Sequence, residues 1–120
     1  MQYMLLIHDD EGTWGAMSEE ERQGLMGEYA AFSERLRSDG AMVDGNRLDH
    51  SHTATTVRVR DGQRILTDGP FAETREVLGG YYLVEADTLD QAIEYAAQIP
   101  SARLGAIEVR PVMQVPSRTG

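Results

Sequence analysis

Residues 68 to 82 read Asp-Gly-Pro-Phe-Ala-Glu-Thr-Arg-Glu-Val-Leu-Gly-Gly-Tyr-Tyr. Gly69 permits a positive φ, and Pro70 fixes φ while donating no backbone hydrogen bond, so the segment opens on a turn. Gly79 and Gly80 precede an apolar alternation, which indicates a strand whose first residues approach other groups closely. The stretch therefore predicts a charged turn between two strands, and the rest of the chain is arranged around it.

Three charged residues, Glu73, Arg75 and Glu76, follow this turn closely. A turn rich in acids between two strands is a place where a scaffold commonly presents its chemistry. The plainer interpretation is a solvated turn, or charges that only lock the turn or a subunit interface. If residues 72–78 form a helical turn, the two glutamates share a face. Because these charges closely precede the paired glycines, we expect at least one of the glutamates to pair with a buried partner.

The chain before this stretch contains a buried strand and an amphipathic helix. Residues 3–8 are an apolar run that ends in a histidine, as expected of a central strand. Residues 11–17, with the only tryptophan, are expected to form a loop. Ser18 and Glu21 make a capping box, so a helix begins there and runs to a glycine. A single apolar stripe marks the inner face of this helix: Leu25, Tyr29, Phe32 and Leu36.

Beyond the first helix, hydrophobic periodicity predicts further strands and one more helix. An Asp-Gly pair at 61–62 between two alternating runs is a strong hairpin signal. Thr88 caps the second helix, and Pro100 closes it. The expected elements are strands at 41–45, 55–60 with its return to Asp68, 81–85 and 107–111, and a helix whose inner face carries Leu89, Ile93, Ala96 and Ala97.

This order of elements is β-α-β-β-α-β with an added β-hairpin, a ferredoxin-like α+β plan. We expect a single domain over residues 1–114, followed by a flexible tail at 115–120. Two helices can cover only one face of the sheet, and the other face carries apolar residues from strands such as 3–7. A second copy of the chain is the simplest cover, so we expect a homodimer.

Composition limits the class of partner. The 120-residue chain has a net charge of −9 and a pI near 4.6, which argues against duplex DNA, RNA or an anionic membrane surface as a direct partner. The sequence has no cysteine, so it offers neither a disulfide framework nor a thiolate nucleophile. No run has the length of a signal peptide or a transmembrane helix, and a cytoplasmic location is expected.

Several catalytic motifs do not occur in the sequence: a P-loop, a dinucleotide-binding glycine fingerprint, a Gly-x-Ser-x-Gly elbow and a cysteine nucleophile. Acid/base chemistry with carboxylates, histidine and tyrosine remains. His8 ends a buried strand, although a solvated terminus beside acids is the plainer interpretation. His50 and His52 have the spacing of a metal pair, but no third ligand is marked, so we expect neither a metal nor another cofactor.

The stretch 68–82 resembles the signature of the DGPF family, within the YCII-related superfamily, through Asp-Gly-Pro-Phe, Ala-Glu-Thr-Arg-Glu and Leu-Gly-Gly-Tyr-Tyr. The runs 3–7, 54–58 and 107–112 fit the same family, so the resemblance covers nearly the whole chain. It implies ferredoxin-like domains that pair face to face as a dimeric α/β-barrel. Superfamily members have been proposed to be enzymes with a histidine–aspartate pair, and a related member resembles a dehydrochlorinase of aromatic degradation.

The resemblance also directs attention to particular residues. The superfamily's first-helix histidine falls near Tyr29 in this sequence, whereas Asp68 keeps the acid of the turn. His8 could supply an imidazole from another strand end. We therefore expect catalytic roles for Asp68, His8 and Tyr29. Further ligand-binding residues are expected around them: Arg22, Phe71, Glu73, Arg75, Glu76 and Tyr82.

These residues predict a small homodimer with a pocket for a small polar or aromatic molecule, where proton transfer, elimination or isomerisation takes place. The alternative is a non-catalytic binding or regulatory module of sigma-factor-dependent transcription, because family members are often encoded beside extracytoplasmic-function sigma factors. In that case the acidic charge favours a protein partner over DNA. A lined cavity with shifted pKa values favours the enzyme, whereas a filled site favours a structural role.

Overall fold

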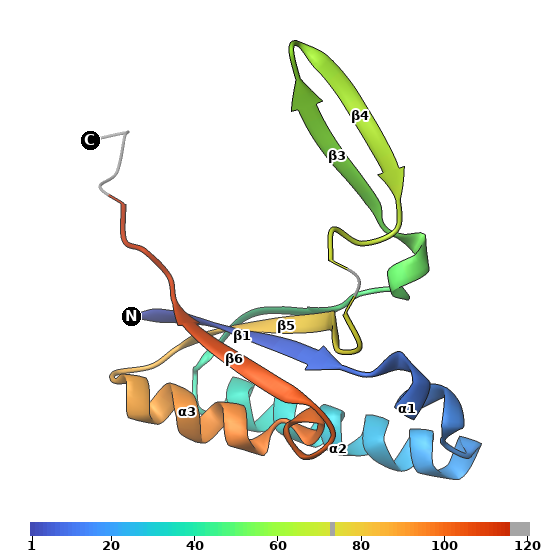
Figure 1. Cartoon of the computed structure of the whole chain (residues 1–120). Coiled ribbons are helices and arrows are strands. Elements are labelled where there is room, and N and C mark those ends of the chain that lie inside the picture. Colours follow the sequence, from blue (N-terminus) through green and yellow to red (C-terminus); the bar gives the residue numbers. More distant parts are fainter. Residues whose placement is uncertain (73, 116–120) are drawn as a thin grey trace.

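The computed structural model describes residues 1–72 and 74–115, so Glu73 and the expected tail at 116–120 lie outside the described residues. Within those ranges the chain forms six strands, three α-helices and two short 3₁₀ turns (Figure 1). In chain order they are β1 (Gln2–Asp9), α1 (Glu11–Ala16), α2 (Glu19–Ser38), β2 (Met42–Arg47), η1 (Ser51–Thr53), β3 (Thr55–Arg60), β4 (Gln63–Asp68), β5 (Val77–Glu85), α3 (Leu89–Gln98), η2 (Pro100–Arg103) and β6 (Ala106–Pro111).

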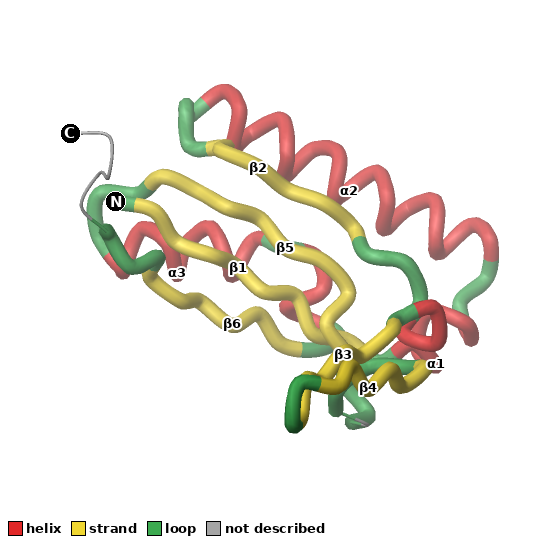
Figure 2. The backbone as a smooth tube through the Cα atoms, turned by 90° about the horizontal axis from the view of Figure 1, so that it is seen from above, coloured by secondary structure: helices red, strands yellow, loops and turns green. Residues whose placement is uncertain are grey.

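Four of the strands form one antiparallel sheet, in the order β2-β5-β1-β6. With α2 and α3 between them, these strands run β-α-β-β-α-β along the chain, which is the ferredoxin-like order that the sequence predicts. Both helices lie on the same face of the sheet, and no described helix covers the opposite face (Figures 1 and 2). The α+β class is therefore confirmed.

The core lies between the sheet and these two helices. Tyr3, Leu5 and Ile7 alternate inward along β1, and each is at most 6% exposed. A capping box starts α2, as predicted. Phe32 of this helix packs edge to face against Tyr82 of β5, with 5.1 Å between ring centroids. Among the described residues, no helix is long and apolar enough to cross a membrane.

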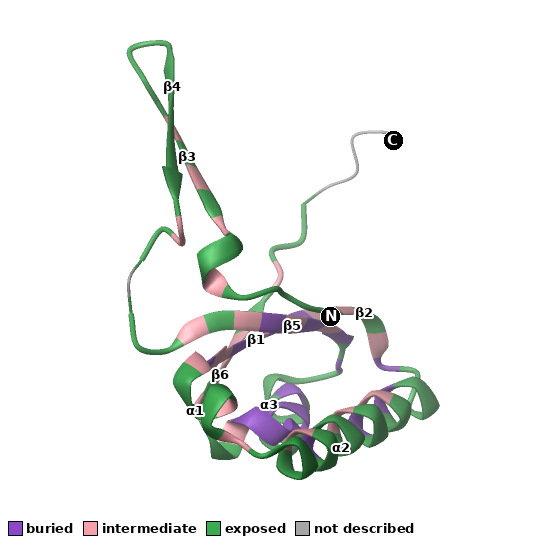
Figure 3. Ribbon diagram, turned by 90° about the vertical axis from the view of Figure 1, so that its right-hand side faces the viewer, coloured by how far each residue is buried: buried purple, intermediate pink, exposed green. Residues whose placement is uncertain are grey.

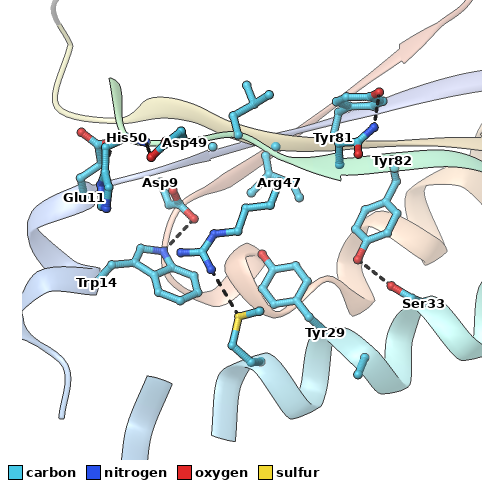
Figure 4. Close-up of a pocket in the computed structure, with 18 of the residues that line it drawn as sticks. Asp9, Glu11, Trp14, Tyr29, Ser33, Arg47, Asp49, His50, Tyr81 and Tyr82 are labelled. Atoms are coloured by element: carbon cyan, nitrogen blue, oxygen red, sulfur yellow. Dashed lines mark hydrogen bonds and ion pairs between the residues drawn. The ribbon is translucent and has the colours of Figure 1, made fainter. Parts of the chain in front are cut away.

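The expected loop at 11–17 was wrong, because most of it forms α1. The Asp10 side chain accepts a hydrogen bond from the Gly12 backbone N–H at 2.8 Å and caps this helix. An aspartate directly before the segment is the local signal that the expectation missed. The helix matters for the site because it carries Trp14 towards the inner face of the sheet (Figure 4).

The predicted inner face of the second helix was also wrong in part. Leu89 and Ile93 are 48% and 46% exposed, whereas Ala92 and Tyr95 are buried. Tyr95 occupies the inner position because its hydroxyl donates a hydrogen bond to Asp39 at 3.0 Å. That bond satisfies the polar end of a large apolar ring, so a tyrosine serves there as a core residue.

The predicted hairpin forms a separate two-stranded sheet of β3 and β4. Its turn residues Asp61 and Gly62 have φ values of 52° and 74°, which fit the type I′ turn favoured by an Asp-Gly pair. The hairpin stands away from the four-stranded sheet, on the side opposite to the helices (Figures 1 and 3). The Cα radius of gyration is accordingly 16.7 Å. A compact domain of this length has a value of about 14 Å.

Candidate functional site

A cavity of about 660 Å³ lies between α1, α2 and the inner face of β1, β2 and β5 (Figure 4). Its lining mixes aromatic, apolar and charged side chains, as is usual for small-molecule sites. The lining residues of polar or charged type are Asp9, Glu11, Trp14, Tyr29, Ser33, Arg37, Asn46, Arg47, Asp49, His50, Tyr81 and Tyr82.

A buried carboxylate, that of Asp9, lines this cavity and is only 6% exposed. Its Oδ2 accepts hydrogen bonds from Trp14 Nε1 and from Ser101 Oγ, each at 3.0 Å. The Tyr29 hydroxyl lies 2.5 Å from the same Ser101 oxygen. Because serine has one hydroxyl proton and gives it to Asp9, Tyr29 must be the donor to Ser101. The three groups thus form a directed chain from Tyr29 to the carboxylate.

Strand geometry explains how Asp9 comes to be buried. It follows Tyr3, Leu5 and Ile7 at the next inward position of β1. On the neighbouring strand β5, where the register shifts, Gly79 leaves room for the carboxylate, since a Cβ there would lie 3.0 Å from Asp9 Oδ1. The close approach that the paired glycines predict is therefore confirmed. It brings a carboxylate to the cavity wall with one oxygen, Oδ1, beside bare backbone.

The pKa of Tyr29 is raised above its usual value of 10.0, first by burial and then by the nearby charge of Asp9. The hydrogen bond with Ser101 opposes this shift. Burial disfavours the phenolate because an ionised oxygen loses its hydration. Tyr29 is therefore a neutral hydrogen-bond donor over the physiological pH range, as the directed chain requires.

A positive charge faces the same cavity. The guanidinium of Arg47 lies over the ring of Trp14, 5.0 Å from its centroid, and Nη1 is 3.6 Å from the sulfur of Met26. Over residues 1–72 and 74–115, none of the ion pairs includes Arg47. A cavity-lining guanidinium without a carboxylate partner favours a ligand that carries negative charge.

The cavity mouth is held by a contact between α1 and η1. The Glu11 carboxylate accepts hydrogen bonds from the Ser51 backbone N–H at 2.7 Å and from its hydroxyl at 2.6 Å. These bonds, helped by His50 at 3.7 Å, hold the pKa of Glu11 below its usual value. The loop that follows β2 is thereby tied to the helix that carries Trp14.

The structure separates the three expected catalytic residues. Tyr29 lines the cavity, and so does Tyr82, whose hydroxyl lies 2.9 Å from Ser33 Oγ. His8 precedes Asp9 in β1 and therefore points to the opposite face of the sheet. There its Nε2 lies 3.6 Å from a carboxylate oxygen of Glu108 on β6.

Asp68 lies at a second, more open hollow of about 590 Å³ at the root of the hairpin, which Pro70 and Arg75 also line. The guanidinium of Arg75 forms an ion pair with Asp10 at 3.2 Å, with 90% of its side chain exposed. The described residues between β4 and β5 form bends rather than a helical turn. This hollow and the cavity share Glu11 as a wall residue, and their other lining residues differ.

The other expected ligand-binding residues that the structure describes do not line the cavity. Phe71 is 79% exposed and lies under the guanidinium of Arg58, 5.2 Å from the ring centroid. Glu76 is exposed, and Glu73 lies outside the described residues. Arg22 remains on α2, where Nη2 is 3.8 Å from a Glu19 oxygen.

Sequence reasoning missed Asp9, Trp14 and Arg47, which line the cavity, and the buried Ser101, which bonds to Asp9. Asp9 could have been found, because an acid at the next inward position of a buried strand is unusual. Ser101 gave no local signal, since its burial depends on where η2 meets β1. For a metal, no group of three or more His, Cys, Asp or Glu side chains converges within the described residues.

The fold and the cavity define a ferredoxin-like α+β domain with a ligand-sized hollow between helix and sheet. The YCII-related domain matches residues 1–116, so the chain belongs to the YCII-related family. It is 36% identical over 114 residues to an uncharacterised protein of Rhizobium meliloti, covering 93% of this chain and 92% of that protein.

Among solved structures, a similar fold is found in the 5-chloro-2-hydroxyhydroquinone dehydrochlorinase of Burkholderia phenoliruptrix, in complex with 2,5-dihydroxybenzoquinone. The TM-score is 0.56, and the match covers 96% of each chain. At 14% sequence identity this similarity concerns the fold alone.

Proposed function

We propose that this protein binds a small, planar, anionic molecule in the Asp9 cavity and catalyses a proton transfer there, within an elimination or isomerisation. The observation that carries the proposal is the buried Asp9 carboxylate, held by Trp14 and Ser101 at a cavity that Arg47 also lines, a cation without an ion pair in the described part of the chain. A carboxylate removed from water and fixed by donors is suited to act as a general base.

The two carboxylate oxygens of Asp9 have different roles in this proposal. Oδ2 is committed to Trp14 and Ser101, whereas Oδ1 lies beside Gly79 and has no donor among the described residues. Oδ1 is therefore the atom that accepts a proton from the ligand. Arg47 stabilises the negative charge that the ligand carries or develops, and the aromatic rings of Trp14 and Tyr29, on either side of the Arg47 side chain (Figure 4), line the same cavity.

The ligand of the structural neighbour supplies a suitable probe. 2,5-Dihydroxybenzoquinone is planar and acidic, and its ring C–H positions report proton transfer by exchange in deuterated water. We expect the protein to accelerate this exchange, and Asp9→Asn to lower the acceleration about a hundredfold. Asp68→Asn, the matched change at the other hollow, should leave it unchanged.

The exchange experiment separates three hypotheses. Loss of acceleration in Asp68→Asn or His8→Ala, with Asp9→Asn unaffected, would favour the residues expected from the sequence over the cavity. Binding of the probe without any acceleration would make the protein a binding module rather than an enzyme. Acceleration that Asp9→Asn does not reduce would contradict the role of Asp9.

The same proposal includes a homodimer that pairs the uncovered sheet faces. Met4, Leu6 and Leu83 alternate with the core residues and therefore lie on the face that no described helix covers. A second copy would bury this apolar surface in a face-to-face barrel. Sedimentation at micromolar concentration tests it, and a stable monomer would contradict it.

We also assign the chain to the DGPF branch of its family and expect it in the cytoplasm. The support for the branch is the stretch 68–82, with its Asp-Gly-Pro-Phe turn and paired glycines. Gly80 has a structural reason to be there, since a Cβ would lie 2.9 Å from the Asn46 carbonyl oxygen. Cell fractionation tests the location.

A further inference from the structure

The β3–β4 hairpin exposes apolar surface on a segment that stands free of the body. Val57, Val59 and Leu66 are 57%, 57% and 61% exposed (Figure 3). An isolated two-stranded hairpin is marginally stable in water, because it has no second layer on which to bury its apolar side chains. The hairpin therefore has the properties of an arm that packs against something outside its own chain.

The apolar side chains share one face of the arm. In the β3–β4 register Val57 pairs with Leu66, and Val59 pairs with Arg64, so these four lie on the same side. On the other side Arg58 pairs with Ile65. We call the row of Val57, Val59 and Leu66 the arm stripe. Only the side that bears the arm stripe offers a continuous apolar contact.

The charge of the arm is opposite to that of the rest of the chain. Residues 55–68 hold three arginines and two aspartates. The whole chain has 11 basic and 20 acidic residues, which leaves 8 basic and 18 acidic residues outside the arm. A net positive arm is thus attracted to the acidic body of another copy of the same chain.

The direction and length of the arm fit the same partner. It rises on the side of the sheet that no helix covers (Figure 1). Its strands have six residues each, and a strand of that length spans about 20 Å. Two stacked sheets lie about 10 Å apart. The arm therefore extends beyond a sheet stacked on the uncovered face and can lie along the side of that second copy.

We propose that the β3–β4 hairpin is a clasp, which packs its arm stripe against the body of a second copy of this chain. The inference rests on the homodimer of the proposed function and adds a contact that stabilises that dimer. In a two-fold dimer each copy contributes one arm, so the contact is made twice.

Adjacent residues on opposite sides of the arm provide the test. Leu66→Asp places a charge in the arm stripe, and Ile65→Asp places it next along the chain but on the other side. Both side chains are exposed, at 61% and 44%, so neither change should unfold the body. We expect Leu66→Asp to raise the dimer dissociation constant about tenfold or more and Ile65→Asp to change it less than about threefold, measured by sedimentation equilibrium.

An armless variant provides a second measurement. Thr55 and Asp68 are paired across the root of the hairpin, so a two-residue turn can replace residues 56–67. We expect this variant to remain folded by circular dichroism and to dimerise at least about tenfold more weakly. The wild-type dimer should also weaken as salt is raised from about 0.05 M to about 0.5 M, because the arm and body attract through opposite charges.

The outcomes separate this proposal from the one on which it rests. A wild-type dimer that neither Leu66→Asp nor the armless variant weakens would overturn the clasp and leave the sheet-face dimer standing. Equal weakening by Leu66→Asp and Ile65→Asp would overturn the assignment of the arm stripe. A monomeric wild-type protein would contradict both the homodimer and the clasp.

Discussion

The loop between β4 and β5 and the Asp9 cavity are both rich in polar groups, but they are built in opposite ways. In the loop the described charges, Arg75 and Glu76, are neighbours in sequence and exposed, with 90% of the Arg75 side chain accessible. At the cavity, Asp9, Tyr29 and the buried Ser101 that joins them come from three distant segments and depend on one another for hydrogen bonds. Clustered charge in a sequence therefore marks a loop, whereas interdependent polar groups mark the site that is removed from water.

This contrast predicts that replacing Asp9 destabilises the fold far more than replacing Asp68, which is the largest effect that we expect. Asp9→Ala leaves Trp14 Nε1–H and the Ser101 hydroxyl without their acceptor in a buried place, which should cost about 3 kcal/mol of unfolding free energy. Asp68→Ala removes an exposed side chain and should cost less than about 0.5 kcal/mol. Urea melts of both variants measure the difference, and equal losses would contradict the contrast.

Substitution of Ser101 should give the next largest loss of unfolding free energy. Its hydroxyl is fully buried and joins Tyr29 to Asp9, so Ser101→Ala should destabilise the fold by about 1–2 kcal/mol. Ser33→Ala is the matched control, because that hydroxyl has one partner, Tyr82, at a partly buried position. The control should lose about half as much or less. A control that loses more than Ser101→Ala would count against a shared network at Asp9.

Tyr29 makes stability depend on pH at the alkaline end. Its pKa is raised in the folded protein, so the folded state keeps a proton that the unfolded state releases above pH 10.0. This contribution is complete below that pH and is lost as the pH rises through the folded-state pKa. Urea melts between about pH 9 and about pH 11 should show a steeper loss for the wild type than for Tyr29→Phe. Parallel curves would mean that Tyr29 is solvated.

A substitution in the loop between β4 and β5 should give the smallest change in unfolding free energy. Arg75→Ala breaks the ion pair with Asp10, but with that side chain 90% exposed it should change the unfolding free energy by less than about 0.5 kcal/mol. High salt should reduce even this difference. A loss above about 1 kcal/mol would show that the loop is a structural element in its own right.

Much of the fold could be predicted because its signals are local. The capping box of α2, the Asp-Gly turn and the inward alternation of Tyr3, Leu5 and Ile7 all act over a few residues. The order of these elements then restricts the topology. The uncovered face of the sheet was also predictable, because the two helices expected from the sequence can cover only one face.

The site was harder to predict because its polar groups meet only after the chain has folded. Alternation along β1 contains enough information to place Asp9 inward and His8 outward, although the sequence prediction selected His8 and not Asp9 as a site residue. Ser101 and Arg47 carry no comparable signal. Their positions depend on how η2 meets the end of β1 and on how β2 pairs with β5, which are properties of the whole fold.

The most direct test of the central claim is a ligand titration followed at Trp14. Trp14 is the only tryptophan, so its indole N–H gives a single nuclear magnetic resonance signal, located at the hydrogen bond to Asp9. With 2,5-dihydroxybenzoquinone as the probe, we predict a saturable shift of this signal. The affinity that the titration yields should be retained in Asp68→Asn and weakened about tenfold or more in Arg47→Gln. A Trp14 signal that stays in place while the amide of Gly69 shifts would contradict the account, because the ligand would then occupy the hollow beside the loop.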